Sequence, residues 1–336
     1  MLYNKRHIYL RSPLRISFVG GGTDLESFYS QGETGHVVSS SIDLYNYVSI
    51  KDMFDSNVRV HHAEIETEPI TSRIKHSYSR TALEHFGIFK GAEVILTSDV
   101  MTTGSGLGAS SAMMSSLILG CSSLRDKSIR NKKEHSELTF RLEAEAGTVG
   151  GRQDQYATVF GGFNSITFTD KKTDVKNIKI SGENLNRLES RLFLVFTNMA
   201  RENKIIQTRL GTNSLDGDKF RYFLKLRDLS QEFLKTLESP KFNLNEFGRL
   251  LHESWKLKKS TNSHTSNPFI DQLYDALRKK GVTGGKVLGA GGGGFLLAFA
   301  GDPKIKEKIK YELYPNFIAL DIKFTNKGTE TLWKNF

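Results

Sequence analysis

The nine residues from Gly104 to Ala112, GSGLGASSA, have the composition of a loop that could hold an anion. They contain three glycines and three serines, and apolar residues at helical spacing follow over 110–124. Backbone N–H groups at the start of a helix lack internal partners and carry the positive end of the helix dipole. Glycines let a polyanion approach these groups, and serine hydroxyls add donors or metal ligands. We interpret the run as a phosphate cradle, with a tight turn and a serine N-cap as the structural alternative.

Other phosphate-binding and kinase motifs can be tested against the same sequence. The P-loop pattern GxxxxGK[ST] occurs nowhere in the chain, and neither do the HRD and DFG motifs of protein kinases. GSGLGA does match the dinucleotide pattern GxGxxA, which should directly follow a strand and precede a second strand ending in an acidic residue. Here SDVMTT separates the preceding strand from the glycines, and Asp126 lies in a polar, basic segment. The sequence therefore excludes a P-loop nucleotide site and disfavours a dinucleotide fold.

Three glycine-containing blocks, in the same order as in the family, resemble the motifs of the GHMP kinases. This family of small-molecule kinases is named for galactokinase, homoserine kinase, mevalonate kinase and phosphomevalonate kinase. The blocks are SPLRISFVGGGTDLESF (12–28), TTGSGLGASSA (102–112) and KVLGAGGGGFLLAF (286–299). The resemblance implies that the second block is the nucleotide-phosphate loop. Its expected nucleotide-binding residues are Gly104, Ser105, Gly106, Leu107, Gly108, Ala109, Ser110 and Ser111.

Further blocks resemble the sugar-1-kinases of the family, among them those that act on heptose 7-phosphate. These blocks are GGRQDQYATVFGG (150–162), LHESWKLKKS (251–260) and SNPFIDQLYDAL (266–277). The resemblance implies ATP- and Mg²⁺-dependent phosphorylation of the anomeric C1 hydroxyl of D-glycero-D-manno-heptose 7-phosphate. The product would be the 1,7-bisphosphate used to make nucleotide-activated heptose. Two alternatives stay open, namely a fucokinase-like enzyme for an unphosphorylated sugar and a sensor that binds sugar and nucleotide without turnover.

The resemblance also assigns the catalytic pair and the metal ligands. Asp154 stands where related enzymes carry a catalytic aspartate, which would accept the proton of the attacking hydroxyl. Arg15 is expected beside this carboxylate and the γ-phosphate, where it could also act as a structural ion pair between two motifs. Glu143 is expected to hold Mg²⁺ together with Ser110 or Ser111, because Mg²⁺ prefers oxygen ligands. The alternative for Glu143 is an ordinary exposed helix glutamate.

The acceptor sugar is expected at the turn after the first block and at the glycines of the third. Asp24 could take two adjacent hydroxyls, while the alternative for Thr23 and Asp24 is a helix cap. The glycines of the third block would approach the substrate or close the cleft between domains. Arg201 could meet the phosphate of the acceptor. The expected substrate-binding residues are Gly20, Gly21, Gly22, Thr23, Asp24, Arg201, Gly291, Gly292 and Gly293.

Three neighbouring lysines and two histidine-containing segments complete the set of candidates. Lys256, Lys258 and Lys259 are alternatives for the acceptor phosphate, although we interpret them as a solvated helix face. The pair His61–His62 has no HExxH or carboxylate pattern around it and is not expected to bind metal. His252 and Trp255 are expected to pack or orient other groups.

The elements that must position these residues are interspersed strands and helices without regular βαβ alternation, which indicates an α+β class. The resemblance implies a two-domain GHMP kinase fold, with a ribosomal-protein-S5-domain-2-like domain over 1–180 and a ferredoxin-like α/β sandwich over 181–336. The polar stretch 169–187 is the expected boundary. Strand patterns cover 6–19, 36–50, 92–98, 161–168, 190–197, 317–324 and two parts of 284–301. Helical patterns cover 110–124, 133–147, 199–210, 218–238, 244–260, 267–280 and 303–313.

Composition limits the classes of protein further. Cys121 is the only cysteine, which excludes a disulfide within the chain and any cysteine-rich zinc site. The first residues lack the apolar core of a signal peptide, and no run approaches the roughly 20 apolar residues of a membrane span, so a cytoplasmic protein without membrane contact is expected. The net charge of +10 is scattered, and without a zinc finger or RNP motif it favours anionic small molecules over nucleic acid. A homodimer stays open.

Overall fold

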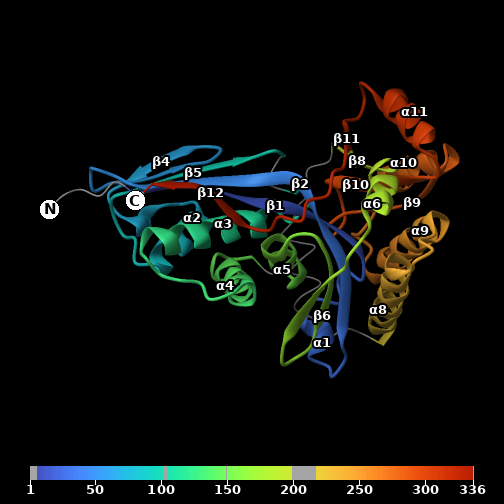
Figure 1. The fold of residues 1–336 in the computed structure, drawn as a ribbon, viewed down its shortest axis with the longest axis horizontal. Coiled ribbons are helices and arrows are strands. Elements are labelled where there is room, and N and C mark those ends of the chain that lie inside the picture. The colour runs from blue at the N-terminus through green and yellow to red at the C-terminus, as the bar shows by residue number, and fades with distance from the viewer. Residues whose placement is uncertain (1–5, 101–103, 149, 199–216, 336) are drawn as a thin grey trace.

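The computed structural model describes residues 6–100, 104–148, 150–198 and 217–335, which form an α+β fold with two sheets (Figure 1). The first sheet has the strand order β12-β1-β2-β5-β3-β4, and β6 and β7 extend it beside β2. The second has the order β11-β8-β10-β9. The strands of the first sheet are β1 (His7–Val19), β2 (Gly35–Asp52), β3 (Val58–His61), β4 (Ile65–Glu68), β5 (Ala92–Ser98), β6 (Phe163–Phe168), β7 (Thr173–Asn177) and β12 (Glu330–Asn335). Those of the second are β8 (Leu192–Phe196), β9 (Val282–Val287), β10 (Phe295–Ala300) and β11 (Ala319–Asp321).

Helices α2 to α5 lie on one face of the first sheet, and α9 to α11 pack against the second (Figure 1). Helix α8 packs against α9 and against β1 and β2 of the first sheet. None of the described helices is long and apolar enough to cross a membrane. Their bounds are α1 (Glu26–Tyr29), α2 (Ser77–His85), α3 (Ala109–Leu124), α4 (Lys132–Glu145), α5 (Gln153–Phe160), α6 (Gly182–Glu189), α8 (Gly217–Glu238), α9 (Leu244–Thr261), α10 (Pro268–Lys279) and α11 (Pro303–Leu313), with a 3₁₀ turn at Thr71–Arg73.

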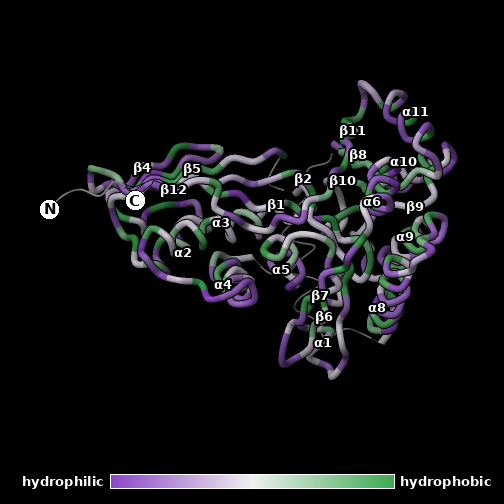
Figure 2. The backbone as a smooth tube through the Cα atoms, in the orientation of Figure 1, coloured by the Kyte–Doolittle hydropathy of each residue, from purple (hydrophilic) through white to green (hydrophobic). Residues whose placement is uncertain are grey.

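Local sequence explains where many of these helices begin. The side chains of Asn131, Asn243 and Asn267 each accept a bond from a backbone N–H in the first turn of the helix that follows. Asp302 does the same for α11, and Pro303 then occupies the first helical position. The helix α8 carries alternating hydrophilic and hydrophobic segments (Figure 2), as expected for a helix with one face against the protein.

One apolar core extends beneath both sheets. The ring of Phe18 in β1 stacks on Phe163 of β6 with centroids 5.9 Å apart. The same ring lies 5.7 Å from Phe233 of α8 and 5.7 Å from Phe247 of α9. All four side chains belong to a single buried cluster that also contains Leu194 of the second sheet. The two sheets are therefore joined by packed side chains as well as by the chain itself.

Most of the expected elements are present, with differences where pairing is non-local. The predicted strands over 6–19, 36–50 and 92–98 match β1, β2 and β5 within a few residues. The predicted helices over 110–124 and 133–147 match α3 and α4 equally well. The polar stretch 169–187, the expected boundary, contains β7 and the start of α6. Residues 58–85 contain β3, β4 and α2, and β12 pairs with β1 beyond the last expected strand. The expected helix over 199–210 lies outside the described residues, and the domain boundary near residue 180 stays a prediction.

A buried histidine connects the two halves of the molecule. His36 of β2 makes one ring-nitrogen bond to Ser230 Oγ of α8 at 2.6 Å and another to Ser165 Oγ of β6 at 2.8 Å. Burial lowers the pKa of His36 to about 4. The unfolded chain takes up this proton near pH 6.5 whereas the folded chain does not. Folded stability from this group is therefore present above pH 6.5 and lost as the pH falls toward 4.

We expect the free energy of unfolding to fall by about 3 kcal/mol between pH 6.5 and 4 through His36 alone, because its pKa is about 4 in the folded chain and near 6.5 in the unfolded chain. His36→Gln should remove this share of the pH dependence, whereas His264→Gln, at an exposed position, should keep it. Urea unfolding at several pH values measures both. Equal pH slopes in the His36→Gln variant and the unaltered protein would contradict the prediction.

Candidate active site

A cavity lies where the turn after β1, the glycine loop before α3 and the first turn of α5 meet the end of α9. These segments are far apart in the sequence, and the folded chain brings them around one space. The side chains and backbone that line it are Arg15, Ser17, Gly21, Gly22, Asp24, Leu25, Gly104, Ser105, Gly106, Gly108, Ala109, Ser110, Ser111, Glu143, Thr148, Gly150, Gly151, Gln153, Asp154, Gln155, Phe223, Lys258, Thr261, Thr265, Gly289 and Ala290.

The glycine loop leads directly into α3. Gly104, Gly106 and Gly108 all have positive φ, between 72° and 78°, a conformation that favours glycine, and Gly108 is the N-cap of α3. The loop is fixed from both sides, because Arg15 N–H donates to Leu107 O at 2.9 Å and Phe295 N–H donates to Ser105 O at 3.0 Å. The first turn of α3 carries no acidic residue. This geometry suits an anion at the N-terminus of a sixteen-residue helix.

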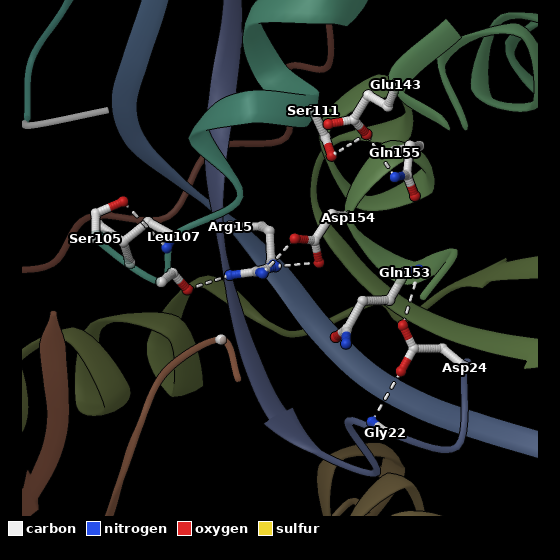
Figure 3. Close-up of polar contacts among 12 residues, drawn as sticks. Arg15, Gly22, Asp24, Ser105, Leu107, Ser111, Glu143, Gln153, Asp154 and Gln155 are labelled. Carbon is white, nitrogen blue, oxygen red and sulfur yellow. Dashed lines mark hydrogen bonds and ion pairs between the residues drawn. The ribbon is translucent and has the colours of Figure 1, made fainter. Parts of the chain in front are cut away.

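Arg15 and Asp154 form a two-pronged ion pair beside that loop (Figure 3). Arg15 Nε donates to Asp154 Oδ1 at 2.7 Å, and its Nη2 donates to Oδ2 at 2.5 Å. The remaining Nη1 donates to Gly106 O at 2.5 Å. The Arg15 side chain is buried, whereas the Asp154 side chain is 24% exposed and lines the cavity. The pair therefore ties the first turn of α5 to the glycine loop and leaves the carboxylate accessible.

Glu143 is a buried carboxylate at the other side of the α3 N-terminus. Its Oε2 accepts a bond from Ser111 Oγ at 2.6 Å and one from Gln155 Nε2 at 2.5 Å (Figure 3). Its Oε1 is buried and has no hydrogen-bond partner among the described residues. Burial raises the pKa of Glu143 to about 7, against the smaller lowering by these two bonds. An unpartnered carboxylate oxygen next to loop serines is the donor set that a hard divalent cation takes.

Asp24 lies in a tight turn on the opposite wall of the cavity. Its Oδ1 accepts from Gly22 N–H at 2.8 Å, and its Oδ2 accepts from Gln153 N–H at 3.2 Å. Burial raises the pKa of Asp24, and the nearby Asp154 charge adds to that shift. A Cβ on Gly151 would lie 1.9 Å from Asp24 Oδ2, so this turn needs glycine opposite the carboxylate. Asp24 therefore joins the first block to α5 and faces the same space as Asp154.

The structure places some of the predicted substrate residues elsewhere. Thr23 is fully buried, and its Oγ1 lies within donor distance of Gly20 O at 2.9 Å and His36 O at 3.0 Å and accepts from His36 N–H at 3.0 Å, so its hydroxyl holds the turn. It does not cap α1, whose N-cap is Leu25. Arg201 lies outside the described residues and stays a prediction. Predicted residues that do not line the cavity are Gly20, Thr23, Leu107, Gly291, Gly292 and Gly293.

The glycines of the third block pack against backbone. A Cβ on Gly294 would lie 2.3 Å from Gly104 O, and a Cβ on Gly291 would lie 2.4 Å from Thr265 O. Both have positive φ. Of the two roles expected for this block, the geometry favours closing the wall between the halves of the protein, while Gly289 reaches the cavity.

Lys258 contradicts the interpretation of the α9 lysines as a solvated face. Its side chain is buried, lines the cavity and donates from Nζ to Val287 O at 3.3 Å and to Gly289 O. Helical spacing could have revealed this, because Lys258 follows the buried Leu251 by seven residues and the buried Trp255 by three. Lys259 instead pairs with Asp271 at 3.0 Å.

Several uncharged cavity residues gave no signal in the sequence. Ser17, Gln153 and Gln155 line the cavity from β1 and α5, and Thr261 and Thr265 line it from the end of α9 and the loop beyond. The only indication in the sequence is that Ser17, Gln153 and Gln155 lie in the same blocks as Arg15 and Asp154.

In chemical terms, the cavity combines an anion-binding helix start, a carboxylate within reach of a bound hydroxyl and a second carboxylate suited to a cation. These are the parts that phosphoryl transfer requires. The paired Arg15 adds positive charge between the anion site and Asp154. The arrangement can therefore bind a polyphosphate and orient an attacking hydroxyl.

Family models and known proteins match this chain. The model "GHMP kinases N terminal domain" matches residues 73–162, and "GHMP kinases C terminal" matches residues 233–318, together more than half of the chain. The chain is 29% identical over 347 residues to D-glycero-alpha-D-manno-heptose 7-phosphate kinase of Campylobacter jejuni, covering 97% of this chain and 99% of that protein. It is 25% identical to the bifunctional fucokinase/GDP-fucose pyrophosphorylase of Arabidopsis thaliana, covering 97% of this chain and 33% of that protein.

Solved structures share the fold over nearly the whole chain. A D-glycero-D-manno-heptose 1-phosphate kinase from Bacteroides thetaiotaomicron superimposes with a TM-score of 0.77 at 23% identity, covering 98% of this chain and 99% of that one. Galactokinase from Lactococcus lactis, complexed with galactose, has a TM-score of 0.73 at 19% identity, covering 97% and 95%. At these identities the likeness concerns the fold.

Proposed function

The chain belongs to the GHMP kinase family and is a sugar kinase, and from that premise we propose that it phosphorylates the anomeric C1 hydroxyl of D-glycero-D-manno-heptose 7-phosphate. The phosphoryl donor is ATP, and the product is the 1,7-bisphosphate, a precursor for nucleotide-activated heptose. Support for the heptose comes from the 29% identity to the Campylobacter jejuni enzyme over nearly the full length of both chains.

One observation carries the assignment of the reaction centre. The Asp154 carboxylate, held by two bonds from Arg15, opens on the same cavity as the N-terminus of α3. A polyphosphate bound at the glycine loop and a sugar bound beside Asp154 would share that space. This proximity is what lets a positioned carboxylate act on the attacking hydroxyl.

In the proposed reaction, Asp154 accepts the proton of the C1 hydroxyl as the sugar oxygen attacks the γ-phosphorus. A bond forms between that oxygen and the phosphorus, and the bond from the phosphorus to the bridging oxygen of ADP breaks. Each carboxylate oxygen of Asp154 accepts one bond from Arg15 and retains a second lone pair for the sugar. The backbone N–H groups at the start of α3 and the Arg15 guanidinium would offset the charge of the transferring group.

Glu143, Ser110 and Ser111 would hold Mg²⁺ on the other side of the phosphate loop. The buried, unpartnered Oε1 of Glu143 fits this role. Within the described part of the chain, no cluster of three or more His, Cys, Asp or Glu side chains could hold a metal ion. That agrees with Mg²⁺, which usually takes only one or two carboxylates plus substrate phosphates and water. When bound at these residues, Mg²⁺ would supply positive charge that offsets the charge of the phosphates.

The acceptor sugar would lie along the wall formed by Gly21, Gly22 and Asp24. A short carboxylate there can accept bonds from two neighbouring hydroxyls. Lys258, at the same cavity, provides positive charge and is a candidate for the phosphate at the far end of the sugar, as is Arg201.

The test is incubation with ATP and Mg²⁺ and, separately, D-glycero-D-manno-heptose 7-phosphate, sedoheptulose 7-phosphate, fucose and mannose. We expect ADP release and a new phosphorus NMR signal at C1 only with the heptose phosphate. A signal on fucose alone would replace the proposal by a fucokinase-like function. Binding of sugar and ATP without ADP release from any acceptor would indicate a sensor.

A further inference from the structure

Two buried polar atoms without partners face the acceptor side of the cavity. They are Ser17 Oγ of β1 and Gln153 Oε1 of α5, and neither has a hydrogen-bond partner among the described residues. Ser17 is 3% exposed, and both residues line the cavity. Glu143 Oε1 and Gln155 Oε1 of the same cavity are unpartnered as well. Buried polar groups in folded proteins are nearly always bonded, so such groups around one cavity indicate a ligand that bonds to them.

The two groups lie close to one another around Gly21. A Cβ built on Gly21 would be 3.1 Å from Ser17 Oγ and 3.5 Å from Gln153 Nε2. Ser17 follows Arg15 by two residues in β1, and alternate residues of a strand project to the same side. Gln153 directly precedes Asp154, and its backbone N–H donates to Asp24 Oδ2 at 3.2 Å. The Gln153 side chain lies between Asp24 and Asp154 in Figure 3, and Ser17 lines the same cavity as both carboxylates.

The chemistry of this group of side chains suits neighbouring hydroxyls. A serine hydroxyl can donate and accept, and a glutamine amide offers one acceptor oxygen and two donor hydrogens. The carboxylates of Asp24 and Asp154 accept from hydroxyls and repel phosphate. The reacting end of a polyol therefore fits here better than its phosphorylated end.

We propose that Ser17 and Gln153 bind the hydroxyl group on C2, the carbon next to the reacting C1 of the acceptor, and so select among sugars. This inference rests on the proposed function, because it concerns the acceptor of the same reaction. It assigns to these two residues recognition of the sugar and no part in the proton transfer.

The test measures sugar binding by calorimetry without ATP or Mg²⁺, so that turnover is not needed. The variants are Ser17→Ala and Gln153→Met. The probes are D-glycero-D-manno-heptose 7-phosphate and its 2-deoxy analogue. The unaltered protein should bind the parent sugar about 10-fold more tightly than the analogue, whereas each variant should bind the parent about 10-fold more weakly and lose most of that preference. The KM for ATP should stay unchanged.

Ser39→Ala is the matched control. Ser39 Oγ is also buried and unpartnered among the described residues, but Ser39 does not line the cavity. A serine whose loss only disturbs packing would lower the melting temperature without changing the preference for the parent sugar. Variants that keep the full preference, or a Ser39→Ala protein that loses it equally, would overturn the inference while the proposed function stands. Unaltered protein that binds the sugar without phosphorylating it would overturn the function alone, and protein that binds neither probe would overturn both.

Discussion

Asp154→Asn is expected to lower kcat by about 10²- to 10⁴-fold, the range over which a positioned general base contributes. Asparagine has nearly the same shape and can still accept one bond from Arg15, but it cannot take the proton of the sugar hydroxyl. The Kd for ATP, measured by calorimetry or fluorescence, should change little, because the glycine loop and α3 keep their backbone bonds to Arg15 and Phe295. The loss should appear in kcat at saturating sugar.

The same substitution leaves the buried Arg15 with a weaker partner, so a fall in stability is expected as well. Breaking a fully buried ion pair costs about 3–5 kcal/mol. The Asp154 side chain is 24% exposed, so water screens part of that effect and the loss should be smaller. Asp275→Asn, at an exposed position of α10, is the matched control and should keep both kcat and stability. Retention of full kcat in Asp154→Asn would remove Asp154 from the role of base.

Glu143→Gln is expected to raise the Mg²⁺ concentration needed for half-maximal rate by at least about 10- to 100-fold. The substitution replaces the unpartnered carboxylate oxygen by one atom of a neutral amide, which is a much weaker ligand for a hard cation. The folded protein without metal should not lose stability, because the carboxylate that is removed is buried and its two bonds, from Ser111 and Gln155, come from uncharged groups. A titration of rate against Mg²⁺, with thermal unfolding in chelator, measures both effects.

Glu145→Gln controls for the change of charge on the same helix. Glu145 is exposed and lies 3.9 Å from Arg141, so it should show the Mg²⁺ dependence of the unaltered protein. The hypothesis that Glu143 is a metal ligand fails if both variants respond alike, or if Glu143→Gln changes the Kd for the sugar but leaves the Mg²⁺ titration unchanged.

Sequence alone could identify candidate site residues that lie in the motifs resembling the family. The glycine loop, Arg15 and Asp154 stand in such motifs, and the family resemblance adds Glu143; apart from Leu107 of the loop, all of them line one cavity. Their chemical roles stay predictions. The motifs do not show which hydrogen bonds each residue makes within the protein. Thr23 stands beside Asp24 in the first motif, but its hydroxyl makes its hydrogen bonds to the backbone of Gly20 and His36.

The less predictable parts of the fold depend on contacts between distant segments. The strand β12 forms because it pairs with β1, which lies more than 300 residues earlier. Burial of Lys258 depends on its position on the inner face of α9, where the carbonyls of Val287 and Gly289 accept its protons. A helical pattern identifies that face, but only the strand β9 packed against it shows why a lysine can be buried there.

The aromatic cluster around Phe18 bears on how ligands reach the reaction centre. A domain opening that separated the two sheets would move this ring away from Phe233 and Phe247 and expose all three rings to water. Exposing each ring would cost about 1.5–3 kcal/mol of folding free energy. Any movement that separated the two sheets would therefore work against this cluster. The spacing between the glycine loop and Asp154 has a separate origin, because Arg15 bonds to Gly106 O and to both oxygens of Asp154 and so fixes it in the folded chain.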